Sequence, residues 1–237
     1  MNDIQTELSR IIGHKFADAE QLPEHTSTGF EYIVGSNGIY VRAIRPSIQV
    51  TIPVSTHQQP LKGLADIRPN IEIAPKIPES LLLEMWSLAC QACSTQSLEI
   101  LFHLTLEQEH WRLTVPNQQQ SPNQCQPTNT SYGSTAHRAT VEIHSHGQLP
   151  AFFSPTDDQD EATGFRVYGV LGKVRSSQPE MVLRVCIFGH CCHLPIHQVF
   201  DIEPDSTFLF DLTQHYLQQH NSLPFYQCPR HEQTAEL

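Results

Sequence analysis

The chain has 237 residues, with 25 acidic residues against 14 Lys and Arg, and a formal net charge of −11. This length suits one good-sized domain or a domain with a smaller appendage, and 39% hydrophobic with 16% charged residues is typical of a folded globular protein. The excess of acid disfavours nucleic acid as a partner, because phosphate binding depends on clustered Lys and Arg.

The amino-terminal residues MNDIQTELSR lack the cationic start and apolar core of a signal peptide. No apolar run reaches the roughly 18–20 residues of a membrane helix, so no membrane partner is expected. The seven cysteines are odd in number and do not resemble a secreted disulfide framework. Together these features predict a cytoplasmic protein.

Residues 1–75 are predicted to be a β-rich amino-terminal segment that begins with a short amphipathic helix over residues 3–12. Two runs with period-two alternation flank Ser36-Asn37-Gly38, and Asn-Gly is a strong hairpin signal. Five prolines between residues 53 and 78 then indicate extended chain.

Pro78 followed by ESLLLEMWSLACQACS predicts a helix whose core-facing residues are Leu82, Met85, Trp86, Ala89 and Cys93. Two strands follow, in SLEILFHLTLEQ and HWRLTVP. Residues 116–136 consist mainly of Gln, Asn, Pro, Ser and Thr, which favours a mobile surface loop.

The rest of the chain predicts a strand at 139–146, a short helix from about 155 to 162 and a strand at 165–174. A strand pair in MVLRVCIFGHCCHLPI turns near Gly189, and FLFDLTQHYLQQH forms a final helix before a tail at 221–237. Helices mixed with hairpin-linked strands indicate an α/β (α+β) domain over residues 76–220.

Three side chains in this stretch have the spacing of a metal site. His144 and His146 are two apart on a predicted strand, so both imidazoles leave the same face. Asp157 follows at the start of the short helix. Three protein ligands with one open position are typical of catalytic zinc. Ser154 and Pro155 also read as a plain helix start, with Ser as the N-cap, and both interpretations can hold together.

The string His144-Ser145-His146, seven residues, then Ser154 and Asp157 resembles the JAMM (MPN-plus) signature at every position. The surrounding residues are similar to the prokaryotic JAB-domain proteins, such as the A component of the PRTRC gene system, over roughly residues 78–200. The resemblance implies a JAB/MPN-like (cytidine-deaminase-like) mixed β-sheet flanked by helices. Gly147 departs from the Pro that many relatives have after the second His.

The resemblance also implies a zinc metallopeptidase that hydrolyses a peptide or isopeptide bond. Zn²⁺ would be held by His144, His146 and Asp157, and Ser154 would stabilise the oxyanion. Glu99 matches the general base by its position after the long helix. Glu142 remains an alternative general base because it shares the histidines' face. A second alternative is that Glu99 is simply a solvent-exposed residue. The implied substrate is a peptide or a ubiquitin-like protein, and a ubiquitin-activating-type enzyme is a further partner.

Two other functions remain open: a non-catalytic interaction module of the same fold, and a His-rich metal sensor using some of the 14 histidines. The run from His190 to His197 also contains Cys191, Cys192 and His193. Its adjacent cysteines lack the spacing of zinc fingers, so a hairpin with buried cysteines is the preferred interpretation over a second metal site.

Overall fold

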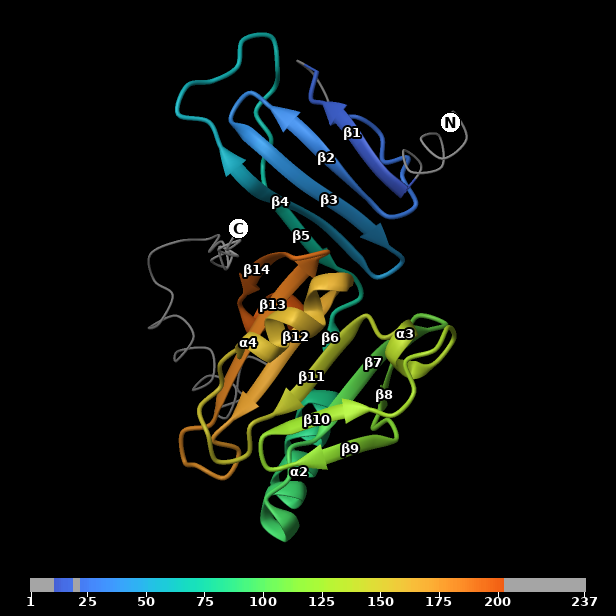
Figure 1. Cartoon of the computed structure of the whole chain (residues 1–237), viewed down its shortest axis with the longest axis vertical. Helices are drawn as coiled ribbons and strands as arrows, with labels where there is room; N and C mark the ends of the chain where they lie inside the picture. The colour runs from blue at the N-terminus through green and yellow to red at the C-terminus, as the bar shows by residue number, and fades with distance from the viewer. Residues whose placement is uncertain (1–10, 19–21, 203–237) are drawn as a thin grey trace, which may run out of the picture.

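The computed structural model describes residues 11–18 and 22–202, arranged around two large β-sheets and two small ones (Figure 1). The mixed sheets with few helices confirm the predicted α/β (α+β) class. No helix in the described part of the chain is long and apolar enough to cross a membrane. The predicted carboxy-terminal helix and the tail at 221–237 lie outside the described residues.

The amino-terminal sheet has five strands in spatial order 1 to 5: β1 (Ile12–Phe16), β2 (Phe30–Gly35), β3 (Gly38–Arg45), β4 (Ile48–Thr56) and β5 (Asn70–Ile73). The predicted hairpin joins β2 and β3, with Gly35 paired to Gly38. Residues 3–10 of the predicted first helix lie outside the described residues. At Ile12 that prediction is wrong, because the chain there pairs in parallel with Phe30 of β2.

The second sheet has six strands in the order β14-β13-β12-β11-β7-β8. Its strands are β7 (Leu101–Glu107), β8 (His110–Thr114), β11 (Val141–Ser145), β12 (Phe165–Gly172), β13 (Glu180–Ile187) and β14 (His190–Leu194). Only β11 and β12 run parallel among these neighbouring pairs.

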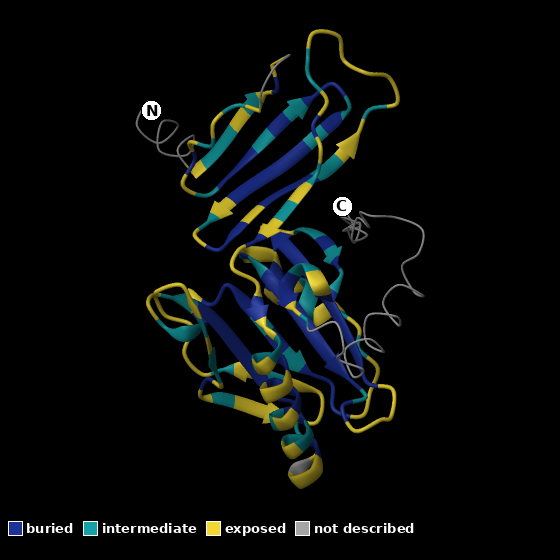
Figure 2. Cartoon of the chain, turned by 180° about the vertical axis from the view of Figure 1, so that it is seen from behind, coloured by how far each residue is buried: buried dark blue, intermediate teal, exposed yellow. Residues whose placement is uncertain are grey.

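The two faces of this sheet differ in character. Helix α2 (Glu79–Gln96) lies on one face and α4 (Pro155–Asp160) on the other (Figures 1 and 2). The five apolar residues predicted for the core side of α2 are all buried, as expected. On the α4 face, register places a row of polar residues side by side on successive strands: His103, Glu142, Tyr168, Arg184 and His193.

The shorter elements complete the domain. They are β6 (Ile77–Pro78), β9 (Gln118–Ser121), β10 (Gln124–Pro127), α3 (Thr135–Arg138), the 3₁₀ turn η1 (Glu161–Thr163), α5 (Ile196–Val199) and β15 (Phe200–Asp201). The prediction of a loop over residues 116–136 is therefore wrong. The polar composition concealed a β9–β10 hairpin, which is stabilised by hydrogen bonds to residues 99–101 that are remote in sequence.

The cysteines also depart from expectation. Cys186 and Cys191 lie directly opposite each other on β13 and β14 and form a disulfide. The sequence predicted buried, unpaired cysteines in this hairpin. Cys192, whose side chain leaves the opposite face, is a free buried cysteine in the apolar core as predicted.

Candidate metal site

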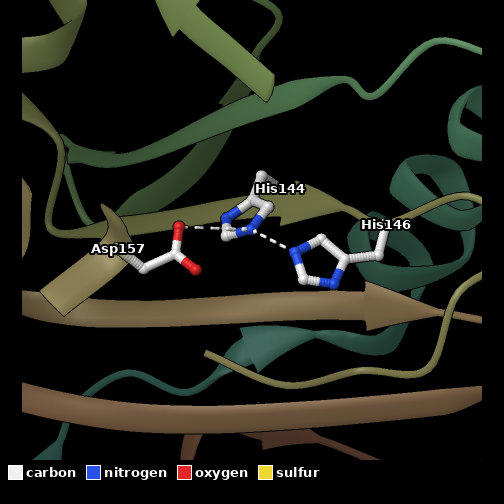
Figure 3. Close-up of side chains that lie close together, drawn as sticks. All are labelled: His144, His146 and Asp157. Atoms are coloured by element: carbon white, nitrogen blue, oxygen red, sulfur yellow. Dashed lines mark hydrogen bonds and ion pairs between the residues drawn. The ribbon is translucent and has the colours of Figure 1, made fainter. Parts of the chain in front are cut away.

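Strand β11 and the residue after it bring two histidines together. His144 lies in β11, and His146 follows immediately beyond the strand end, with its backbone N–H still bonded to Leu171 O of β12 (2.8 Å). The two Nε2 atoms lie 3.1 Å apart (Figure 3). Next to them, Gly147 adopts φ of +57°, a left-handed conformation that favours glycine and accounts for the departure from Pro.

Helix α4 places the third side chain through its amino-terminal cap. The Ser154 hydroxyl accepts a hydrogen bond from the Asp157 backbone N–H (3.3 Å), and the Ser154 N–H donates to Asp157 Oδ2 (2.6 Å). This reciprocal pair is a capping box. It fixes one carboxylate oxygen of Asp157, while Oδ1 lies 3.6 Å from His144 Nε2.

The three side chains fit a divalent metal ion. Their ligand atoms all lie within 4.8 Å of one another. His146 Nδ1 lies 3.2 Å from Pro150 O, which favours the tautomer that leaves Nε2 as a lone pair. Burial lowers the pKa of His144 to about 4 and also lowers that of His146, so both are neutral at pH 7. Ligands about 2.0–2.1 Å from a tetrahedral zinc lie roughly 3.3 Å apart, close to the observed separations.

Glu99 lies beside these ligands but not in a strand. It precedes β7 by two residues and is only 4% exposed, which contradicts the solvent-exposed reading. Burial, followed by the charge of Asp157, raises the pKa of its carboxyl to about 8. No described residue donates a hydrogen bond to this carboxyl group. The Glu99 backbone is nevertheless held firmly, because its N–H donates to Ser121 O (3.0 Å) and its carbonyl accepts from Gln120 Nε2 (2.6 Å).

Glu142, the alternative general base, is already paired with other side chains. Its Oε2 accepts from Arg166 Nη1 at 2.9 Å and lies 3.3 Å from His103 Nε2. Burial acts to raise its pKa, but the His103 hydrogen bond and the Arg166 charge outweigh burial and lower it. Glu142 is therefore an ionised partner of Arg166, whereas Glu99 is the carboxyl group available to a bound molecule.

The candidate site lies in one cavity of about 710 Å³. It is lined by the residues predicted for the site, namely Glu99, His144, His146, Ser154 and Asp157, and also by Glu142. Leu149 and Phe152, each about half exposed, line it as well. Gln124, Cys125 and Gln126 of β10 form part of its wall, and sequence reasoning missed them because the hairpin has the composition of a loop.

The run from His190 to His197 is not assembled into a second metal site by the structure. His190 Nε2 lies 2.9 Å from the Tyr32 hydroxyl of the amino-terminal sheet. Cys191 is bonded to Cys186, and Cys192 packs in the core. The second group of potential ligands in the described part of the chain is instead Glu161, Cys186 and Cys191.

Comparison with known proteins gives one family match. The family described as prokaryotic homologues of the JAB domain matches residues 78–186. This span begins just before α2 and ends in β13, so it includes every candidate site residue but not the amino-terminal sheet. No curated protein was found to match the chain. The likeness to the PRTRC component stays a prediction.

Proposed function

Because residues 78–186 match the family of prokaryotic JAB-domain homologues, we propose that this chain is a zinc-dependent JAMM-type hydrolase of peptide or isopeptide bonds. One observation carries the proposal. The ligand atoms of His144, His146 and Asp157 converge in a cavity that also contains Glu99, a buried carboxyl group without a hydrogen-bond donor among the described residues. A scaffold that only binds partners needs neither the ligands nor the unpaired acid.

The protein side chains divide the work of hydrolysis between them. When bound, zinc supplies Lewis-acid polarisation of the scissile carbonyl and of water. Glu99 accepts a proton from the attacking water and delivers it to the leaving nitrogen, and a raised pKa suits a group that must do both. The Ser154 hydroxyl donates its hydrogen to the developing oxyanion while its lone pair caps α4.

We further propose that the substrate is an extended peptide, such as the tail of a ubiquitin-like protein, with a ubiquitin-activating-type enzyme as a second partner. A cavity of about 710 Å³ accommodates a few residues of chain rather than a folded domain. Leu149 and Phe152 offer apolar contacts in the same cavity as the metal ligands. The resemblance to JAMM enzymes supports the choice of substrate class.

The decisive experiment compares zinc content and cleavage in matched variants. Glu99→Gln should keep one zinc per chain, because Glu99 is not a ligand. Its turnover should fall by about 10²–10⁴-fold, the usual contribution of general acid–base catalysis. Asp157→Ala should lose zinc and activity together, and Glu84→Gln, on the exposed side of α2, should change neither.

The substrates are a peptide library and synthetic peptides branched through a lysine side chain, with new amino groups identified by mass spectrometry. Cleavage by the zinc-loaded wild type should stop on addition of a chelator. If Glu99→Gln is as active as wild type while Glu142→Gln is inactive, the general base is Glu142. A zinc-loaded wild type that cleaves none of these substrates would instead favour the non-catalytic interaction module.

A further inference from the structure

A second group of ligand atoms lies on the same face of the six-stranded sheet as the metal site. Glu161 is the first residue of η1, immediately after α4, while Cys186 and Cys191 come from β13 and β14. Their ligand atoms lie within 4.8 Å of one another. In the structure the two cysteines are joined as a disulfide, so this group is a metal site only in its reduced form.

The spacing suits zinc. Cys186 Sγ lies 3.6 Å from Glu161 Oε2. A tetrahedral zinc with bonds of about 2.3 Å to sulfur and about 2.0 Å to oxygen separates these ligands by roughly 3.5 Å. Two unbonded sulfur atoms on directly opposed residues rest in van der Waals contact, close to the roughly 3.7 Å between two thiolates on one zinc. Reduction therefore leaves both cysteines near the positions that a metal requires.

The carboxyl group of Glu161 shares its positively charged partner with a second acid. Glu161 is buried, and burial raises the pKa of its carboxyl to about 8 although Arg184 is paired with it. The Arg184 Nε donates to Glu161 Oε2 at 2.6 Å, but Nη1 of the same guanidinium is paired with Asp158 at 2.7 Å. One positive charge is thus shared between two carboxylates. Glu161 also lines the cavity of the first site, so one ligand of this group is reached from that cavity.

We propose that reduction of the Cys186–Cys191 disulfide creates a second zinc site made of Cys186, Cys191 and Glu161. In the test below, a phosphine and one water molecule react with the disulfide to give phosphine oxide and two thiols. The phosphorus is oxidised, the disulfide is reduced, and both protons of the water end on sulfur. Zinc then displaces the two thiol protons to bind as a dithiolate. The site alternates between a disulfide and a metal, and it does not depend on hydrolysis at the first site.

The test uses the full chain, stripped of metal with a chelator, with and without a phosphine reductant. Native mass spectrometry after zinc addition should show one zinc per oxidised chain and two per reduced chain. With cobalt in place of zinc, only the reduced chain should show the sulfur-to-cobalt charge-transfer absorption. Asp157→Ala should remove the first metal and keep this absorption, which separates the second site from the proposed hydrolase.

Variants of the ligands identify the site. Cys191→Ser should lose the second metal and the absorption, whereas the free cysteine variants Cys192→Ser and Cys125→Ser should keep both. Glu161→Gln leaves both cysteines in place and should weaken the second metal by 10-fold or more, because it removes a ligand. A reduced wild type that binds only one metal overturns the proposal. So does charge-transfer absorption that persists in Cys191→Ser or that vanishes in Cys125→Ser.

Discussion

Two glutamates in the same cavity show how surroundings decide chemistry at the scale of single residues. Glu142 is paired with Arg166 and His103, and these partners hold it ionised. Glu99 is more buried, at 4% exposed, and lacks such partners, and its pKa is raised to about 8. Because the two carboxyl groups differ both in burial and in what donates to them, the geometry supports the proposal that Glu99 exchanges protons with substrate.

Ser154 caps α4 and is proposed to stabilise the oxyanion, and one substitution can separate these two roles. Ser154→Ala should keep zinc and lose about 0.5–2 kcal/mol of stability with the N-cap bond. Its hydrolysis rate should fall by about 10²–10³-fold if the hydroxyl also stabilises the oxyanion. The matched control is Ser176→Ala, which removes a serine hydroxyl that accepts from the Gln178 N–H (3.0 Å) outside the cavity lining and should not slow hydrolysis. Near-normal turnover of Ser154→Ala would leave this serine as a helix cap only.

At the scale of elements, the β9–β10 hairpin connects the loop that carries Glu99 to the rest of the cavity. The side-chain amide of Gln118 both accepts from and donates to the backbone of Leu101, as a neighbouring strand's backbone would. Its Oε1 accepts from Leu101 N–H (2.7 Å), and its Nε2 donates to Leu101 O (3.1 Å). Together with the bonds from Ser121 and Gln120 to Glu99, these contacts hold the chain just before β7.

Gln118→Ala should therefore loosen the backbone at Glu99, the proposed general base. Loss of the two hydrogen bonds to Leu101 and of a third to Pro116 O should cost about 1–3 kcal/mol of stability, with faster amide exchange at Leu101 and slower hydrolysis at unchanged zinc content. Gln119→Ala is the matched control, because Gln119 is exposed on the same strand. If amide exchange at Leu101 is the same in both variants, the hairpin does not position Glu99.

At the scale of the whole molecule, the amino-terminal sheet and the six-stranded sheet share one apolar core. Residues of both belong to a single buried cluster that includes Phe30, Val50 and Val167. The Arg45 guanidinium of β3 donates to Phe165 O of β12 (2.8 Å) and to Ala139 O (3.3 Å). Packing and hydrogen bonds therefore connect the predicted amino-terminal segment, residues 1–75, to the domain that follows it.

We expect the two sheets to unfold together. Calorimetry should show one transition whose calorimetric and van't Hoff enthalpies agree. Arg45→Ala should lower the temperature of that same transition, because it removes the donor to the carbonyls of Phe165, Ala139 and Arg138, at about 1–3 kcal/mol. Arg112→Ala, whose side chain is 70% exposed, should have little effect. Two separate transitions in the wild type would contradict a shared core.

The sequence by itself determined the parts of this protein that depend on neighbours along the chain. Strand periodicity placed His144 and His146 on one face, and the capping pattern placed Asp157 at the start of α4. The helix from residue 79 and the β2–β3 hairpin followed from apolar spacing and turn residues. Each of these signals acts within a few residues, so composition and pattern are enough to detect it.

Only the tertiary structure decided the rest, because it depends on contacts between segments far apart in the chain. Glu99 is 45 residues from His144. Its burial beside the ligands results from sheet pairing and from the β9–β10 hairpin, whose composition is typical of a loop. The choice between Glu99 and Glu142 required knowing which carboxylate Arg166 reaches. The pairing of Cys186 with Cys191 likewise arises from strand register, and register is fixed by packing of the whole sheet rather than by any local pattern.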